Sequence, residues 1–141
     1  MKCILSAAVA FAFVAVPAFA EGDAEEGAKN FNKCKACHVI VDDAGEEIVK
    51  GGKTGPNLYG VVGRTAGTYE GFNYSDAMVS AGEAGLVWEE ADFATYVADP
   101  SKFLKEYLDD TSARGKMTFK LRKEDEVANI WAYLASVGPQ S

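Results

Sequence analysis

The chain has 141 residues, 48% of them hydrophobic, and a formal net charge of −7 at pH 7. This length suits one domain built around a single hydrophobic core. The net acidic charge argues against a nucleic-acid-binding protein, because phosphate backbones are bound by positively charged surfaces.

The N-terminus has the features of an export signal. A positively charged start precedes an apolar run over residues 4–16, which is too short to span a bilayer as a helix. An Ala-Phe-Ala sequence ending at residue 20 matches a signal-peptidase site. The sequence therefore predicts a cleaved secretory signal peptide at 1–20 and a single domain at 21–141, exported to the periplasm. An uncleaved membrane anchor is the alternative interpretation.

The first predicted helix, over residues 23–35, leads into the sequence Cys-Lys-Ala-Cys-His. Cys34, Cys37 and His38 stand within about one helical turn, and His38 is the only histidine of the chain. The remaining cysteine, Cys3, lies in the predicted signal peptide. The chemistry of the mature domain therefore concentrates in this one motif.

Three interpretations of the motif compete. A thiol-redox pair of the thioredoxin type belongs to a βαβ unit, whereas a predicted helix precedes this motif. A closed zinc site needs four nitrogen or sulfur ligands, and the predicted mature chain offers three. C-x-x-C-H is the attachment signature of c-type haem, in which the adjacent histidine ligates the iron. The motif favours haem, with Cys34 and Cys37 as covalent attachment sites and His38 as a ligand.

The middle of the chain alternates loop and helix. Residues 50–64 are rich in glycine and are predicted to form a loop wrapped on the haem. A helix is expected over 89–98. Asp99 can then cap, and Pro100 can open, a further helix.

The last predicted helix begins near the acidic residues 124–126, which suit the positive end of a helix. Its apolar side chains recur at i, i+3, i+4 and i+7, namely Val127, Ile130, Trp131 and Leu134. Gly27 has no side chain, so the two terminal helices are expected to cross there, with Trp131 among the contacts. The predicted fold is all-α, with long loops around one haem.

Two methionines compete for the second axial position of the iron. Met78 lies in a short helix-like stretch, where filling the core is a sufficient role. Met117 lies outside any periodic run, in the sequence Gly-Lys-Met-Thr-Phe. Position favours Met117 as the ligand and leaves Met78 as the alternative.

Several short sequences occur in an order typical of one family: KCKACH, KTGPNLYGVVGR, GFNYSDA, YVADP, GKMTF and NIWAYL. In these motifs the chain is similar to class I cytochromes c and most closely resembles the long-loop cytochrome c2 proteins of purple phototrophic bacteria. The resemblance covers Gly22 to Val137. It implies the class I cytochrome c fold, one covalently attached haem c, and His38 and Met117 as axial ligands. Relatives with short loops lack an insertion like residues 101–116, and many carry a polar amide in place of Met78.

The resemblance also implies roles for residues around the haem. The Pro56 carbonyl would accept a hydrogen bond from the His38 ring. Arg64, Tyr74 and Trp88 would lie near the haem propionates. Tyr96 would approach the Met117 sulfur. A surface arginine and ordinary core aromatics are the alternative interpretation of these side chains.

Positive charge concentrates near Met117 although the chain is acidic. Residues 111–123 contain five lysines and arginines and no acidic residue. Such a surface would attract an acidic partner and orient the haem toward it. The predicted docking residues are Lys33, Lys35, Lys105, Lys116 and Lys120; ordinary solvated lysines are the alternative.

Together these features predict a one-electron carrier, not an enzyme, that is monomeric and contacts membranes only transiently. The resemblance implies reduction by a quinol-oxidising cytochrome bc complex. It implies oxidation by a photosynthetic reaction centre or a terminal cytochrome oxidase. A haem enzyme or gas-binding protein with a labile sixth ligand, similar to a peroxidase, is the alternative function.

Overall fold

A computed structural model describes residues 21–140, so the predicted signal peptide lies outside the described residues. The described part is mostly helical, and none of its helices is long and apolar enough to cross a membrane. The elements in chain order are α1 (Ala24–Asn30), the 3₁₀-helix η1 (Phe31–Lys33), β1 (Ile40–Val41), β2 (Glu47–Val49), α2 (Asp76–Glu83), α3 (Glu90–Ala98), α4 (Pro100–Tyr107) and α5 (Glu124–Val137).

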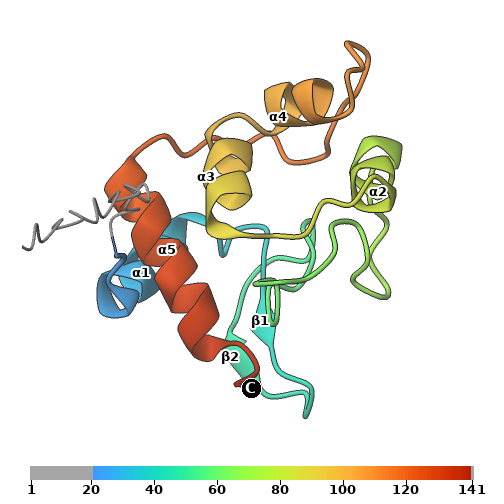
Figure 1. The fold of residues 1–141 in the computed structure, drawn as a ribbon. Helices are drawn as coiled ribbons and strands as arrows, with labels where there is room; N and C mark the ends of the chain where they lie inside the picture. Colours follow the sequence, from blue (N-terminus) through green and yellow to red (C-terminus); the bar gives the residue numbers. More distant parts are fainter. Residues whose placement is uncertain (1–20, 141) are drawn as a thin grey trace, which may run out of the picture.

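The two terminal helices, α1 and α5, lie against each other as predicted (Figure 1). A Cβ atom on Gly27 would stand 1.9 Å from the carbonyl oxygen of Asn129, so only glycine allows this approach. Tyr133 also lies at the crossing. Trp131, expected among the contacts there, packs on Phe93 of α3, with ring centroids 5.1 Å apart.

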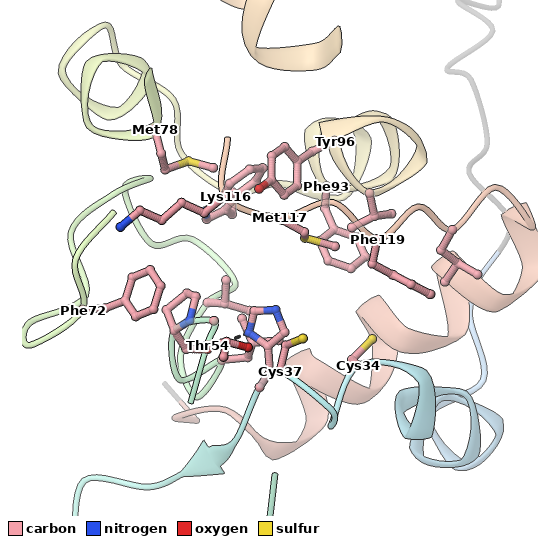
Figure 2. A pocket seen from close by; sticks show the side chains of 18 of the residues that line it. Cys34, Cys37, Thr54, Phe72, Met78, Phe93, Tyr96, Lys116, Met117 and Phe119 are labelled. Carbon is pink, nitrogen blue, oxygen red and sulfur yellow. Dashed lines mark hydrogen bonds between the residues drawn. The ribbon is translucent and has the colours of Figure 1, made fainter. Parts of the chain in front are cut away.

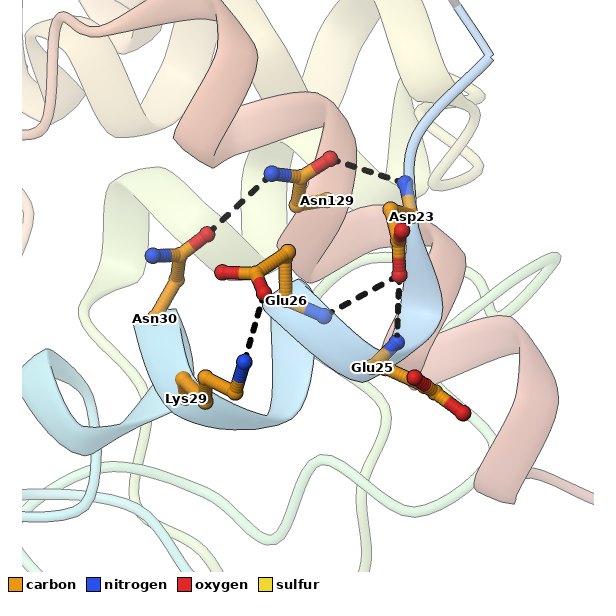
Figure 3. A network of polar contacts seen from close by, with 6 residues as sticks. All are labelled: Asp23, Glu25, Glu26, Lys29, Asn30 and Asn129. Carbon is orange, nitrogen blue, oxygen red and sulfur yellow. Dashed lines mark hydrogen bonds and ion pairs between the residues drawn. The ribbon is translucent and has the colours of Figure 1, made fainter.

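Hydrogen bonds fix the relative position of α1 and α5 (Figure 3). Asp23 caps α1, because its Oδ1 accepts from the backbone N–H groups of Glu25 and Glu26. The Asn129 side chain accepts from Asp23 N at 2.8 Å and donates to Asn30 Oδ1 at 3.3 Å. The start and the end of α1 are thereby tied to one residue of α5.

The first helix is shorter than the predicted range 23–35. It ends at Asn30 and continues as the 3₁₀-helix η1, which tightens the chain immediately before Cys34. Such 3₁₀ turns are frequent at the ends of α-helices. Phe31, at the start of η1, is 1% exposed and anchors the turn in the core.

The junction of α3 and α4 follows the predicted capping. Asp99 Oδ1 accepts from Lys102 N at 3.2 Å, and Pro100 occupies the first turn of α4. Helix α3 itself begins at Glu90, one residue later than expected, with Glu89 as its N-cap residue. The turn places Phe103 and Leu104 in the core.

A short antiparallel hairpin, β1–β2, was not predicted. The turn between its strands is held by Asp42, whose Oδ1 accepts from Ala44 N and Glu46 N, both at 2.9 Å. Gly45 supplies the positive φ of 83° that the turn needs. The glycine-rich residues 50–64 contain no helix or strand, as expected.

Candidate functional site

A cavity of about 330 Å³ lies at the centre of the described fold. Pockets for small ligands and cofactors span roughly 300–1,000 Å³. The lining comes from the Cys-x-x-Cys-His turn, the 54–64 loop, α2, α3, the 116–121 segment and α5. The predicted attachment, ligand and haem-environment residues all line it: Cys34, Cys37, His38, Pro56, Arg64, Tyr74, Trp88, Tyr96 and Met117.

The two thiols enter the cavity from one turn of backbone. Both the Cys37 and the His38 N–H groups donate to the Cys34 carbonyl, at 3.1 and 3.0 Å. This turn directs both sulfur atoms into the cavity (Figure 2). Burial raises the pKa of the Cys34 thiol to about 11. Redox-active cysteines need a lowered thiol pKa, so Cys34 is a poor fit to the thiol-oxidoreductase interpretation.

The His38 ring is fixed by a single strong contact. Its Nδ1 lies 2.7 Å from the Pro56 carbonyl oxygen. A carbonyl can only accept, so Nδ1 carries the proton and Nε2 keeps its lone pair. Burial lowers the pKa of His38, which favours the neutral imidazole that a metal requires.

Gly55 makes room for this ring. A Cβ atom at Gly55 would lie 2.4 Å from His38 Cε1, well inside van der Waals contact. The backbone of the 54–64 loop can therefore lie flat against the imidazole. This close approach accounts for the glycine in the Thr-Gly-Pro-Asn sequence.

Both candidate methionines enter the cavity. Met117 extends into it from the segment after α4, on the side away from the two cysteines (Figure 2). Met78 is 7% exposed and comes from α2. Because both thioethers line the cavity, the lining does not decide which methionine would be the iron ligand.

Trp88 and Tyr96 form part of the cavity wall and are both buried. Their rings lie 5.0 Å apart, and burial raises the pKa of the Tyr96 hydroxyl far above its ordinary value. Tyr96 thus contributes a neutral hydroxyl to an otherwise apolar wall. Both side chains are buried, as either interpretation of them requires.

Arg64 and Tyr74 make protein contacts beside the cavity. The Arg64 guanidinium donates to the carbonyls of Asn57 and Tyr59 and lies over the ring of Tyr69. Burial lowers the pKa of Arg64. The Tyr74 hydroxyl accepts from Tyr69 N at 3.3 Å. Arg64 is therefore a partly buried cation at the edge of the cavity, not a free surface arginine.

The predicted docking lysines divide into two groups. Lys33 and Lys116 line the cavity, whereas Lys35, Lys105 and Lys120 lie outside its lining. Three of the five already have partners: Lys33 pairs with Glu126, Lys120 pairs with Asp99 at 2.7 Å, and Lys116 donates to the Asn73 carbonyl.

Asn57 was not among the predicted site residues, although its side chain makes four hydrogen bonds. Its side-chain amide contacts Val41, Tyr59 and Tyr69. Its position directly after Pro56 was the only feature of the sequence that pointed to a role for Asn57 at the site. An asparagine in a glycine-rich sequence usually indicates a turn, so its burial was not foreseen.

These residues fit a c-type haem. The cavity offers two thiols at the attachment spacing, a neutral imidazole with a free nitrogen, and a thioether on another wall. The remaining lining is largely apolar, with one partly buried arginine that could offset a carboxylate. This set of donors matches the chemistry by which proteins hold haem iron.

No protein-family model matches the chain, but individual proteins do. Cytochrome c-551 of Roseobacter denitrificans is 61% identical over 141 residues, covering 100% of this chain and 99% of that protein. Cytochrome c2 of Cereibacter sphaeroides is 61% identical over 129 residues, covering 89% of each. Among solved structures, cytochrome c2 from Rhodobacter sphaeroides has a TM-score of 0.83 at 59% identity, covering 86% of this chain and 100% of that one. Ferric cytochrome c-550 from Paracoccus versutus has a TM-score of 0.79 at 52% identity, covering 84% and 100%.

Proposed function

The chain belongs to the cytochrome c2 family of electron-transfer proteins, and we propose that it is a periplasmic one-electron carrier between membrane redox complexes. Membership of this family makes it an electron carrier and not an enzyme, and implies a covalently attached c-type haem. The residues around the cavity are the basis for the finer assignments.

Cys34 and Cys37 would form the thioether attachments, and His38 and Met117 would be the axial ligands. The observation that carries this proposal is the hydrogen bond between His38 Nδ1 and the Pro56 carbonyl, because it leaves Nε2 free beside the two thiols. When bound, the haem supplies an iron that alternates between the ferrous and the ferric state.

The surrounding residues would hold this site still while its charge changes. Pro56 keeps the imidazole in one orientation, and such outer contacts tune a metal ligand. Tyr96 and Trp88 exclude water from the side of the cavity that they line. Arg64, with Tyr74 and Trp88, would face the propionates, and Arg64 would offset their negative charge.

The partners would be the complexes on either side of such a carrier. A quinol-oxidising cytochrome bc complex would reduce the protein, and a photosynthetic reaction centre or cytochrome oxidase would oxidise it. Docking would use the basic residues near the cavity, of which Lys116 is exposed and lines it. Export through the predicted signal peptide would bring the chain to these partners as a monomer carrying one haem.

Methionine ligation is tested by paired substitutions. Met117→Ala should abolish the methionine ligand signals in the ferrous NMR spectrum and lower the reduction potential, because a thioether favours the ferrous state. Met78→Ala is the matched control, since it also lines the cavity and should retain both properties. The opposite pattern would assign the ligand to Met78.

The alternative function, a haem enzyme or gas-binding protein, requires an open sixth position. Carbon monoxide should therefore bind the native ferrous protein slowly or not at all at neutral pH. Rapid binding would contradict the carrier proposal. Met117→Ala is the positive control for this measurement, because it should open the position.

A further inference from the structure

Asn57 is the only buried polar or charged residue among residues 21–140, with 8% of its surface exposed. Its Oδ1 accepts from Val41 N and Tyr59 N, both at 3.0 Å. Its Nδ2 donates to the Val41 carbonyl at 2.8 Å and to the Tyr69 hydroxyl at 3.1 Å. A primary amide has two donors and two acceptor lone pairs, so every hydrogen-bonding site of this side chain is used.

These bonds act on a particular peptide group. The carbonyl that accepts from His38 belongs to Pro56, and its peptide nitrogen belongs to Asn57. Asn57 therefore sits at the other end of the peptide plane that holds the imidazole. Two of its four bonds go to the backbone of Val41, three residues beyond His38 along the chain.

The peptide that precedes this plane contributes no donor, because its nitrogen belongs to Pro56 and proline has no N–H. Backbone bonds flank the plane: Gly55 N donates to the Cys37 carbonyl at 2.8 Å, and Leu58 N donates to the Val39 carbonyl at 3.0 Å. Between Gly55 and Leu58 along the chain, the Asn57 side chain adds two hydrogen bonds to Val41 of β1.

We propose that Asn57 is a positioning residue, which holds the Pro56–Asn57 peptide against the His38 ring and so sets the strength of the Nδ1–H···O bond. The proposal rests on the proposed role of His38 as an iron ligand. A stronger bond at Nδ1 makes the imidazole a better electron donor. Asn57 therefore influences the reduction potential without lying in the cavity lining.

The test compares three variants of the haem-loaded protein, with the exchange of the His38 Nδ1 proton measured by NMR in the ferrous state. Asn57→Ala removes the hydrogen-bond partner of the Val41 N–H, the Val41 carbonyl and the Tyr59 N–H. The His38 Nδ1 proton should exchange about tenfold faster, or more, than in the native protein, because lost hydrogen bonds lower the free energy of local opening. The reduction potential should rise, since a weaker donor favours the ferric state less.

Two controls separate positioning from general loss of stability. Asn129→Ala also removes an asparagine that bonds two segments, but at the α1–α5 crossing (Figure 3). It should lower the stability and leave the Nδ1 exchange and the potential unchanged. Tyr69→Phe removes only the outer bond of Asn57 and should also leave both unchanged.

Native-like Nδ1 exchange in folded Asn57→Ala would overturn the proposal, as would an equal acceleration in Asn129→Ala. If Asn57→Ala does not fold, Asn57→Ser retains a hydroxyl and should give an intermediate acceleration; native-like exchange in Asn57→Ser would likewise overturn the proposal. Failure of the proposed ligation is distinguishable, because it would appear in the native protein as absent histidine and methionine ligand signals.

Discussion

At the scale of single residues, the site depends on what Gly55 lacks. The imidazole of His38 occupies the space that any other side chain at position 55 would need. Pro56 follows and offers its carbonyl to the same ring. One residue thus makes room for the imidazole, and the next orients it.

Gly55→Ala should therefore displace the His38 ring. Its Cβ would stand 2.4 Å from Cε1 and 2.7 Å from Nδ1, so the ring or the loop must move. We expect a loss of about 1–3 kcal/mol in the free energy of unfolding, as for other overpacked sites. Denaturant unfolding of the haem-loaded protein measures this loss.

Gly115→Ala is the matched control for this substitution. Its Cβ would meet only a terminal carbon of Leu104, at 3.1 Å, so a shift of a few tenths of an ångström would relieve the contact. Equal stabilities of the two variants would show that His38 is not confined by the loop.

At the scale of elements, Glu126 joins the attachment turn to the last helix. Its side chain lies in the first turn of α5, is 13% exposed, and pairs with both Lys33 and Lys123. Lys33 directly precedes Cys34 at the end of η1. The ion pair therefore connects the helix that crosses α1 with the residue next to the first thiol.

This connection should depend on pH. The hydrogen bond from Lys33 lowers the pKa of Glu126 below its ordinary value of 4.5. A lowered folded-state pKa stabilises the fold above pH 4.5, and this contribution disappears as the pH falls through the lowered value. Glu126→Gln should therefore reduce the stability at pH 7 and have little effect under acid conditions below the folded pKa.

Glu106→Gln is the matched control. Glu106 pairs with Lys102 at 3.8 Å, but both side chains are more than 60% exposed. Exposed pairs contribute little, so this variant should match the native protein across the pH range. A Glu126→Gln defect that persists at low pH would show that its cause is not the ion pair.

At the scale of the whole molecule, the sequence predicted the order of the helices and the Cys-x-x-Cys-His motif that lines the cavity. Apolar periodicity located α5, and Asp99 with Pro100 marked the start of α4, because both signals are local. The role of Asn57 was not predictable, since its partners Val41 and Tyr69 are distant in sequence. The partners of the docking lysines were not predictable for the same reason: Lys33 pairs with Glu126 and Lys120 with Asp99, both far along the chain.

The charge distribution of the molecule gives the last prediction. The segment 111–123 carries five basic residues, and its residues 116–119 and 121 line the cavity, whereas acidic residues gather at 42–47 in and around the β1–β2 turn. An acidic partner surface would attract the cavity side. Because salt screens charges over about 10 Å at 0.1 M, electron transfer to a purified reaction centre or oxidase should slow as the ionic strength rises.

The pairing of each lysine refines this expectation. Lys116 lines the cavity and donates to a neutral carbonyl, and no carboxylate of residues 21–140 forms an ion pair with it. The charge of Lys120 is partly offset by Asp99. Lys116→Glu should therefore slow the second-order transfer rate severalfold at low salt, and Lys120→Glu should slow it less. Glu46→Lys, in the exposed hairpin turn, should leave the rate unchanged or raise it. Equal slowing by all three variants, or rates indifferent to salt, would show that this surface does not guide docking.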